Sequence, residues 1–234
     1  MFVFLDIGFT LMGGPSLGPA GRLIEQFSLP PDAKTLLNHL LFGTHLKTPE
    51  DLAQQLAQHY GLEKTSTLPF IEEVWHKQAS EAFPLPGAKI ALQRLHEARI
   101  PFGFISNIWA PFLEGFIRLF PTEYRQCPVF ASFQVGFVKP DPELYLTALR
   151  QTGMDPQQTV MIGDTYAADI APAQHLGMKT IWILTRPDKE RADLVKLLNK
   201  EKRGPDQTLA SIEHFHPEQL TTLFQTENLT ERKL

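Results

Sequence analysis

The feature that most constrains this chain is a series of short apolar runs that each stop at a polar residue. The clearest runs are residues 1–5, 100–105, 159–162 and 179–184, with 128–131 a weaker fifth. Apolar runs without alternation are typical of strands buried on both faces of a parallel sheet. Helical patterns separate them, at residues 88–98, 111–119, 142–151 and 167–176. This order predicts a doubly wound α/β core. Near the chain end we expect a sixth strand over 208–212, a charged helix over 189–203 and a closing helix.

One long stretch interrupts the alternation. Between Gly14 and Pro86 the sequence has helical periodicity and no convincing strand. Thr48 begins a helix that ends at Gly61, because Thr is a good N-cap and Pro and acidic residues follow it. A further helix is expected over residues 70–83. Glycine and proline bracket the stretch, which predicts a helical cap domain of residues 14–86 inserted in a catalytic core of 1–13 and 87–234.

Composition excludes several classes of protein. The 234 residues are 43% hydrophobic and 21% charged, which excludes a disordered or collagen-like chain. The single cysteine, Cys127, cannot form an internal disulfide. A net charge of −4 disfavours general binding to nucleic acid or anionic membranes. No apolar run could span a bilayer, and Asp6 interrupts the apolar start, so we expect a cytoplasmic protein without a signal peptide. The sequence indicates no oligomeric state.

Polar side chains stand where the predicted strands end. Asp6, Ser106 and Asp164 each follow an apolar run. Asn107 comes next to Ser106, and Lys139 precedes a predicted helix. Because ligands bind outside the carboxyl ends of the strands of an open parallel sheet, we expect these residues to meet at one edge. That edge gathers acids, a hydroxyl and a cation.

These residues belong to four segments that resemble, in order, the motifs of the haloacid dehalogenase superfamily of phosphotransferases and hydrolases. The segments are Asp6-Ile7-Gly8-Phe9-Thr10-Leu11, Phe104-Ile105-Ser106-Asn107, Val138-Lys139-Pro140-Asp141-Pro142 and Ile162-Gly163-Asp164-Thr165, with Asp169 five residues beyond Asp164. The resemblance covers essentially the whole chain, and the predicted cap lies between the first two motifs. It implies a Rossmann-like core and a phosphatase-type hydrolase that acts on a small phosphorylated metabolite.

Chemistry suggests a role for each of these side chains. The Asp6 carboxylate, on a tight turn, is expected to attack phosphorus and form an aspartyl-phosphate. Thr10 and Ser106 are expected to donate hydrogen bonds to the phosphoryl oxygens, helped by free backbone N–H groups. Asn107 is also expected to bind substrate. Lys139 is the cation expected to hold the nucleophile and phosphate together while charge develops.

A cluster of carboxylates points to a metal. Asp6, Asp164 and Asp169 would lie close to a phosphate dianion, and two like charges about 4 Å apart repel by roughly 4 kcal/mol at an effective dielectric near 20. A divalent cation relieves that repulsion, and oxygen ligands beside a phosphate indicate Mg²⁺. The resemblance implies Asp6, Asp164 and the backbone carbonyl of Gly8 as ligands, with Asp169 supporting them from behind.

Gly8 is the main departure from the superfamily pattern. Its phosphatases carry a second aspartate two residues after the nucleophile, which protonates the leaving alkoxide and then activates water. Such a general acid–base group typically contributes about 10²–10⁴-fold to the rate. Without it, we expect poor catalysis on ordinary alkyl phosphates. Position 168 also departs, with alanine where many relatives carry asparagine.

Three functions are compatible with this departure. The first is a phosphatase that acts on substrates with good leaving groups or takes an acid from the cap, where His45, His59 and His76 are candidates. The second is C–P cleavage similar to that of phosphonoacetaldehyde hydrolases, with Lys47 as a candidate Schiff-base lysine. The third is a catalytically weakened protein that binds a phosphorylated ligand. The metal-free dehalogenase branch is disfavoured, because it carries a bulky aromatic residue at the position of Gly8.

Overall fold

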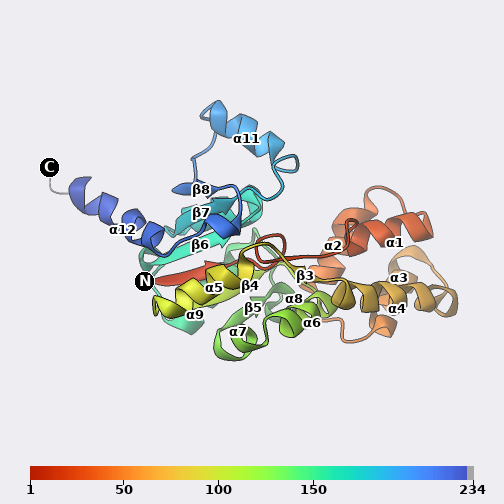
Figure 1. Ribbon diagram of the computed structural model, residues 1–234. Helices are drawn as coiled ribbons and strands as arrows, with labels where there is room; N and C mark the ends of the chain where they lie inside the picture. Colours follow the sequence, from red (N-terminus) through yellow and green to blue (C-terminus); the bar gives the residue numbers. More distant parts are fainter. Residues whose placement is uncertain (231–234) are drawn as a thin grey trace.

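The computed structural model describes residues 1–230 and contains a parallel six-stranded sheet (Figure 1). The strand order is β5-β4-β1-β6-β7-β8, and every neighbouring pair is parallel. The strands are β1 (Phe2–Leu5), β4 (Phe102–Ser106), β5 (Val129–Ala131), β6 (Thr159–Gly163), β7 (Lys179–Ile183) and β8 (Gln207–Leu209). In this register Leu5 of β1 lies between Phe104 and Ile162. The predicted α/β fold is confirmed.

Both faces of the sheet are covered, as its continuous apolar strands require. The side chains of β1 are all buried and alternate between two cores, with Val3 and Leu5 on one face and Phe2 and Phe4 on the other. The helices of this part of the chain are α5 (Ala88–Glu97), α6 (Ala110–Leu119), α7 (Pro121–Gln126), α8 (Ser132–Val135), α9 (Pro142–Thr152), α10 (Ala171–His175), α11 (Arg191–Leu198) and α12 (Glu218–Thr230).

Several expected elements differ in extent. The helix expected over 167–176 is divided into a π-helical turn, Tyr166–Ile170, and the short helix α10. The expected sixth strand ends at Leu209, because a 3₁₀ turn at Ile212–His214 follows and the Ser211 side chain caps it. The charged helix expected over 189–203 is shorter and corresponds to α11.

Four helices fill the segment between β1 and α5. They are α1 (Pro19–Phe27), α2 (Ala33–Gly43), α3 (Pro49–Tyr60) and α4 (Lys64–Ser80). Figure 1 shows them grouped at one end of the molecule, toward which β1 runs. Thr48 caps α3 in a capping box with Asp51, and Gly61 ends it in a left-handed conformation. Among the residues described, no helix is long and apolar enough to cross a membrane.

A two-stranded ribbon joins these four helices to the rest of the chain. Strand β2 (Met12–Gly13) leads into them, strand β3 (Phe83–Pro84) leads out, and the two strands pair antiparallel. The sequence predicted no strand there and a helix over 70–83, and both predictions are wrong in this detail. Helix α4 instead begins at Lys64 and ends at Ser80, so residues 83–84 are free to pair with β2. The division of the chain into two domains stays a prediction.

Candidate active site

Asp6 occupies the first residue beyond the central strand of the sheet. Its backbone N–H donates to the carbonyl of Ile162 at 2.8 Å, which extends the β1–β6 ladder and fixes the start of the turn. Asp6 as a whole is 5% exposed. Ser106 Oγ donates to Asp6 Oδ1 at 3.0 Å, and Thr10 Oγ1 lies 3.4 Å from Oδ2. Three predicted site residues therefore meet within hydrogen-bond distance.

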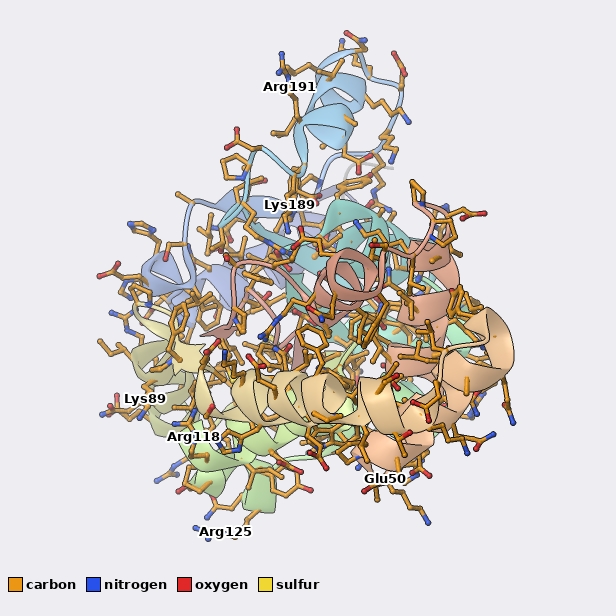
Figure 2. All side chains as sticks on the ribbon, turned by 90° about the vertical axis from the view of Figure 1, so that its right-hand side faces the viewer. Glu50, Lys89, Arg118, Arg125, Lys189 and Arg191 are labelled. Atoms are coloured by element: carbon orange, nitrogen blue, oxygen red, sulfur yellow. The ribbon has the colours of Figure 1, made fainter. Side chains whose placement is uncertain are left out.

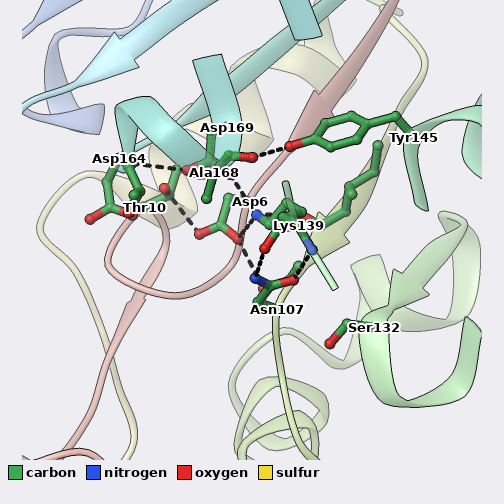
Figure 3. Close-up of polar contacts among 12 residues, drawn as sticks. Asp6, Thr10, Asn107, Ser132, Lys139, Tyr145, Asp164, Ala168 and Asp169 are labelled. Carbon is green, nitrogen blue, oxygen red and sulfur yellow. Dashed lines mark hydrogen bonds and ion pairs between the residues drawn. The ribbon is translucent and has the colours of Figure 1, made fainter. Parts of the chain in front are cut away.

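Lys139 is buried at the centre of the site (Figure 3). Its Nζ donates to Asp6 Oδ1 at 2.6 Å, to Asp169 Oδ1 at 2.5 Å and to the Ile105 carbonyl at 3.1 Å. These three bonds use every hydrogen of the ammonium group. Burial alone would lower the pKa of Lys139, but the carboxylates of Asp169 and Asp6 outweigh it and raise the pKa above its ordinary value. Lys139 is therefore a fixed positive charge.

Asn107 holds the backbone of Lys139. Its Oδ1 accepts from the Lys139 N–H at 2.7 Å, and its Nδ2 donates to the Lys139 carbonyl at 2.9 Å. The amide thus uses both its donor and acceptor groups on one residue of a distant segment. The contact between Asn107 and substrate stays a prediction. The two hydrogen bonds to the Lys139 backbone require both a donor and an acceptor, which an amide side chain supplies.

The π-helical turn brings Asp169 back over the end of β6. Asp169 Oδ2 accepts from the backbone N–H of Thr165 at 2.9 Å, and its carboxyl lies against Gly163. A Cβ at position 163 would lie 2.3 Å from Asp169 Cγ, so only glycine fits beneath this carboxylate. The buried Tyr145 hydroxyl donates to the carbonyl of Ala168 and secures the same turn (Figure 3).

Three buried carboxylates offer oxygen atoms that all lie within 4.8 Å of one another, from Asp6, Asp164 and Asp169. Burial first, and then the charges of Asp6 and Asp169, raise the pKa of Asp164 to about 7. Burial likewise raises the pKa of Asp169 to about 6, although Lys139 opposes that shift. Carboxylates crowded in this way are a donor set that fits a hard divalent cation such as Mg²⁺.

Arg186 is a site residue that the sequence analysis missed. Its Nε and Nη2 bind Asp164 Oδ2 at 2.9 and 2.5 Å. Its Cζ lies 3.6 Å from the centre of the Phe9 ring, a cation–π contact. Phe9 has a φ of 59°, a left-handed conformation that costs a residue with a Cβ roughly 1–2 kcal/mol. The signal was available, because Arg186 follows the apolar run 179–184 just as Asp164 follows the run 159–162.

The turn after Asp6 leaves room beside Gly8. A Cβ built on Gly8 would meet only the Phe112 ring, at 3.7 Å, which is an ordinary van der Waals contact. The position therefore lacks an acid because of its residue type and not because the space is filled. Gly8 lies in the wall of the same cavity as Asp6.

A cavity of about 460 Å³ opens above Asp6, between the sheet edge and the helices α1, α2 and α4. Asn38 and Phe42 line it from α2 and Gln78 from α4, while Trp109 and Phe112 line it from the other side. Trp109 is also buried and packs edge-on against Trp75, at 5.2 Å between ring centres. The lining does not include the cap candidates His45, His59, His76 and Lys47, and all four are exposed.

Comparison with known proteins places the chain in a family. The family model described as haloacid dehalogenase-like hydrolase matches residues 35–183. A glyceraldehyde 3-phosphate phosphatase of Pyrococcus abyssi is 32% identical over 103 residues, which cover 42% of this chain and 41% of that protein. A phosphoserine phosphatase of Thermus thermophilus is 36% identical over 55 residues, or 24% of this chain and 22% of that protein. The chain therefore matches less than half the length of these curated relatives.

Solved structures share the fold over a longer span. The crystal structure of CbbY from Rhodobacter sphaeroides in complex with phosphate superposes with a TM-score of 0.60 at 19% identity, covering 91% of this chain and 95% of that one. An identity this low is evidence for the fold alone. The match of the family model over more than half of the chain shows that the chain belongs to the haloacid dehalogenase-like hydrolases.

Proposed function

We propose that this protein is a Mg²⁺-dependent phosphatase that removes a phosphoryl group from a small metabolite through a phosphorylated Asp6. The observation that carries the proposal is the Asp6 carboxylate, buried beside a fixed Lys139 cation and two hydroxyl donors. The relatives named as phosphatases of glyceraldehyde 3-phosphate and phosphoserine support the same class of substrate.

The residues around Asp6 fit the needs of phosphoryl transfer. Lys139 is proposed to neutralise charge on the nucleophile and on the transferred group, because its ammonium is already bound to Asp6 Oδ1. The hydroxyls of Ser106 and Thr10 donate to Asp6 in this structure and are proposed to turn to the phosphoryl oxygens when substrate binds. Asn107 is proposed to act mainly by keeping Lys139 in place.

Asp6, Asp164 and the backbone carbonyl of Gly8 are proposed to hold Mg²⁺. Asp169 is proposed to support the site without binding the ion, because its two carboxylate oxygens already accept from Lys139 and from the Thr165 N–H. When bound, the cation supplies the positive charge that lets a phosphate dianion approach these carboxylates. The protein buries these three carboxylates and fixes their orientation through hydrogen bonds.

Turnover of two activated substrates tests this proposal. With Mg²⁺, we expect hydrolysis of p-nitrophenyl phosphate and acetyl phosphate, because neither leaving group needs a proton from position 8. Chelating the metal is expected to abolish both activities. Release of phosphate is the measurement. If neither compound is hydrolysed, while inorganic phosphate binds tightly, the protein is a phosphate-binding module and the proposed activity is wrong.

Restoring an acid at position 8 is expected to improve catalysis on alkyl phosphates. Gly8→Asp places a carboxyl group where only the Phe112 ring is near, so the turn can keep its shape. We expect kcat/KM for glycerol phosphate to rise about tenfold or more, since a positioned general acid contributes about 10²–10⁴-fold. Gly8→Asn is the matched control, equal in size but without an acidic proton. Equal rates for the Asp and Asn variants would contradict the prediction.

A further inference from the structure

Positively charged side chains gather on the side of the cavity that follows β7. Arg186 and Lys189 both line the cavity, and both lie over the Phe9 ring, with Arg186 Cζ at 3.6 Å and Lys189 Nζ at 5.5 Å from its centre. Figure 2 shows Lys189 between α11 and the rest of the molecule. The charge of Lys34, on α2, also acts on Lys189. The β7–α11 segment thus contributes two cations to the wall above Asp6.

The acidic charges that act on these cations come from Asp164, near Lys189, and from Glu190, near Arg186. Arg186 pairs with Asp164, a residue proposed to bind Mg²⁺. Within residues 1–230, Lys189 forms no ion pair, and Arg186 Nη1 makes no hydrogen bond. Burial first, and then the charge of Arg186, lower the pKa of Lys189, although the charge of Asp164 opposes that shift. Like charges held together beside a cavity attract an anionic ligand. A divalent cation bound to Asp164 would neutralise the carboxylate that now pairs with Arg186, so the positive charge of Arg186 would be less well compensated.

Position 8 has no acidic side chain. Gly8 therefore cannot supply a proton to a departing group. In-line attack by Asp6 sends the leaving group away from Asp6 into the cavity, whose lining includes Arg186 and Lys189. A leaving group that departs as a stable anion needs positive charge and no proton. Arginine is well suited to that task, because its planar guanidinium binds phosphate oxygens in pairs.

We propose that Arg186 and Lys189 bind a leaving phosphate, and that the substrates of this protein are phosphoanhydrides such as inorganic pyrophosphate or a nucleoside diphosphate. This inference rests on the proposed function, whose nucleophile it uses. It goes further by naming the chemical class of the leaving group and two residues that select it.

The chemical step balances without an acid at position 8. A carboxylate oxygen of Asp6 forms a bond to the terminal phosphorus, and the bond between that phosphorus and the bridging oxygen breaks. The bridging oxygen keeps the electron pair and leaves as an oxygen of a stable anion, which is hydrogen phosphate from singly protonated pyrophosphate or AMP from ADP, and Arg186 and Lys189 bind that anion. Water then attacks the phosphorus of the phosphorylated Asp6, which releases inorganic phosphate, the free carboxylate and one proton to solvent.

The test compares two substrates in three variants of the full chain with Mg²⁺. The substrates are inorganic pyrophosphate and p-nitrophenyl phosphate, whose leaving group carries no phosphate. Lys189→Gln and Arg186→Gln are expected to lower the ratio of kcat/KM for pyrophosphate to that for p-nitrophenyl phosphate by about tenfold or more, as for loss of a hydrogen bond to a charged group. Lys196→Gln, on the exposed face of α11, is the control and is expected to keep the ratio of the unaltered protein.

A binding measurement separates recognition from turnover. Methylenediphosphonate, in which carbon replaces the bridging oxygen, is expected to bind the unaltered protein in calorimetry and to bind Lys189→Gln at least about tenfold more weakly. ADP in place of pyrophosphate shows which of the two anhydrides the cavity accepts. If Lys196→Gln weakens the binding of methylenediphosphonate as much as Lys189→Gln does, the assignment to Lys189 is wrong.

The outcomes distinguish this inference from the proposed function. Hydrolysis of p-nitrophenyl phosphate without hydrolysis of pyrophosphate or ADP would overturn the phosphoanhydride assignment and leave the phosphatase intact. Hydrolysis of both classes with an unchanged ratio in Lys189→Gln and Arg186→Gln would overturn the roles of those residues. If no phosphorylated compound is hydrolysed, the proposed function itself is wrong and this inference ends with it.

Discussion

Asp6→Asn is expected to abolish turnover of p-nitrophenyl phosphate and acetyl phosphate, with kcat lowered by at least about 10³-fold. The amide cannot form a stable bond to phosphorus, although it fills the same space between Ser106 and Lys139. In the unaltered protein, phosphorylated Asp6 is expected to accumulate, because Gly8 offers no base to activate water. Acid quenching followed by mass spectrometry of the Asp6 peptide measures that adduct.

Two controls show whether a loss of activity in Asp6→Asn comes from the chemistry or from unfolding. Asp6→Asn removes one of three crowded carboxylates, so its circular dichroism and melting transition are expected to resemble those of the unaltered chain. Asp32→Asn, at an exposed position before α2 that makes no capping hydrogen bond, is expected to keep full activity. Retained turnover in Asp6→Asn, or an adduct on another residue, would refute the assignment of the nucleophile.

Lys139→Met is expected to lower the free energy of unfolding by about 3–5 kcal/mol, because it leaves buried carboxylates without their cation. Lys139 joins Asp6 and Asp169, and all three side chains are at most 7% exposed. Methionine has a similar length, so the loss reports charge more than volume. Chemical denaturation at neutral pH measures the difference. Added Mg²⁺ is expected to stabilise this variant more than the unaltered protein, since it replaces the missing positive charge.

A surface ion pair provides the comparison. Lys77 binds Glu73 one helical turn away at 2.5 Å, but both side chains are more than 40% exposed. Lys77→Met is therefore expected to cost no more than about 0.5 kcal/mol. If Lys139→Met and Lys77→Met destabilise the protein equally, the buried network around Asp6 does not depend on the lysine charge.

The strands of the sheet were predictable because burial on both faces leaves a continuous apolar signal. The predicted runs 1–5, 100–105 and 179–184 correspond to β1, β4 and β7, with ends shifted by one or two residues. Strands β2 and β3 were missed, because two residues each are too short to show any periodicity. Their pairing depends on contacts between residues about seventy positions apart, which no local pattern reports.

The members of the site were predictable from strand ends, but their contacts were not. Lys139 and Asp169 are thirty residues apart, and their bond depends on a π-helical turn that a helical pattern does not distinguish from an α-helix. The sequence likewise showed Asn107 next to Ser106 without showing that its amide faces the Lys139 backbone. Arg186 follows the apolar run 179–184 by two residues, so its place beyond a strand end is visible in the sequence, whereas its bonds to Asp164 are not.

The short ribbon of β2 and β3 has a mechanical consequence. The polypeptide enters and leaves its four inserted helices through the same two-residue ladder, where the Phe83 ring covers Gly13. Those helices also rest on the remainder of the molecule, α4 against α6 and α2 against α8. A motion that carried these helices away from the sheet edge would bend the chain at the ladder and would break the contacts of α4 with α6 or of α2 with α8. The strength of these two contacts would therefore set how easily the cavity above Asp6 opens to a ligand.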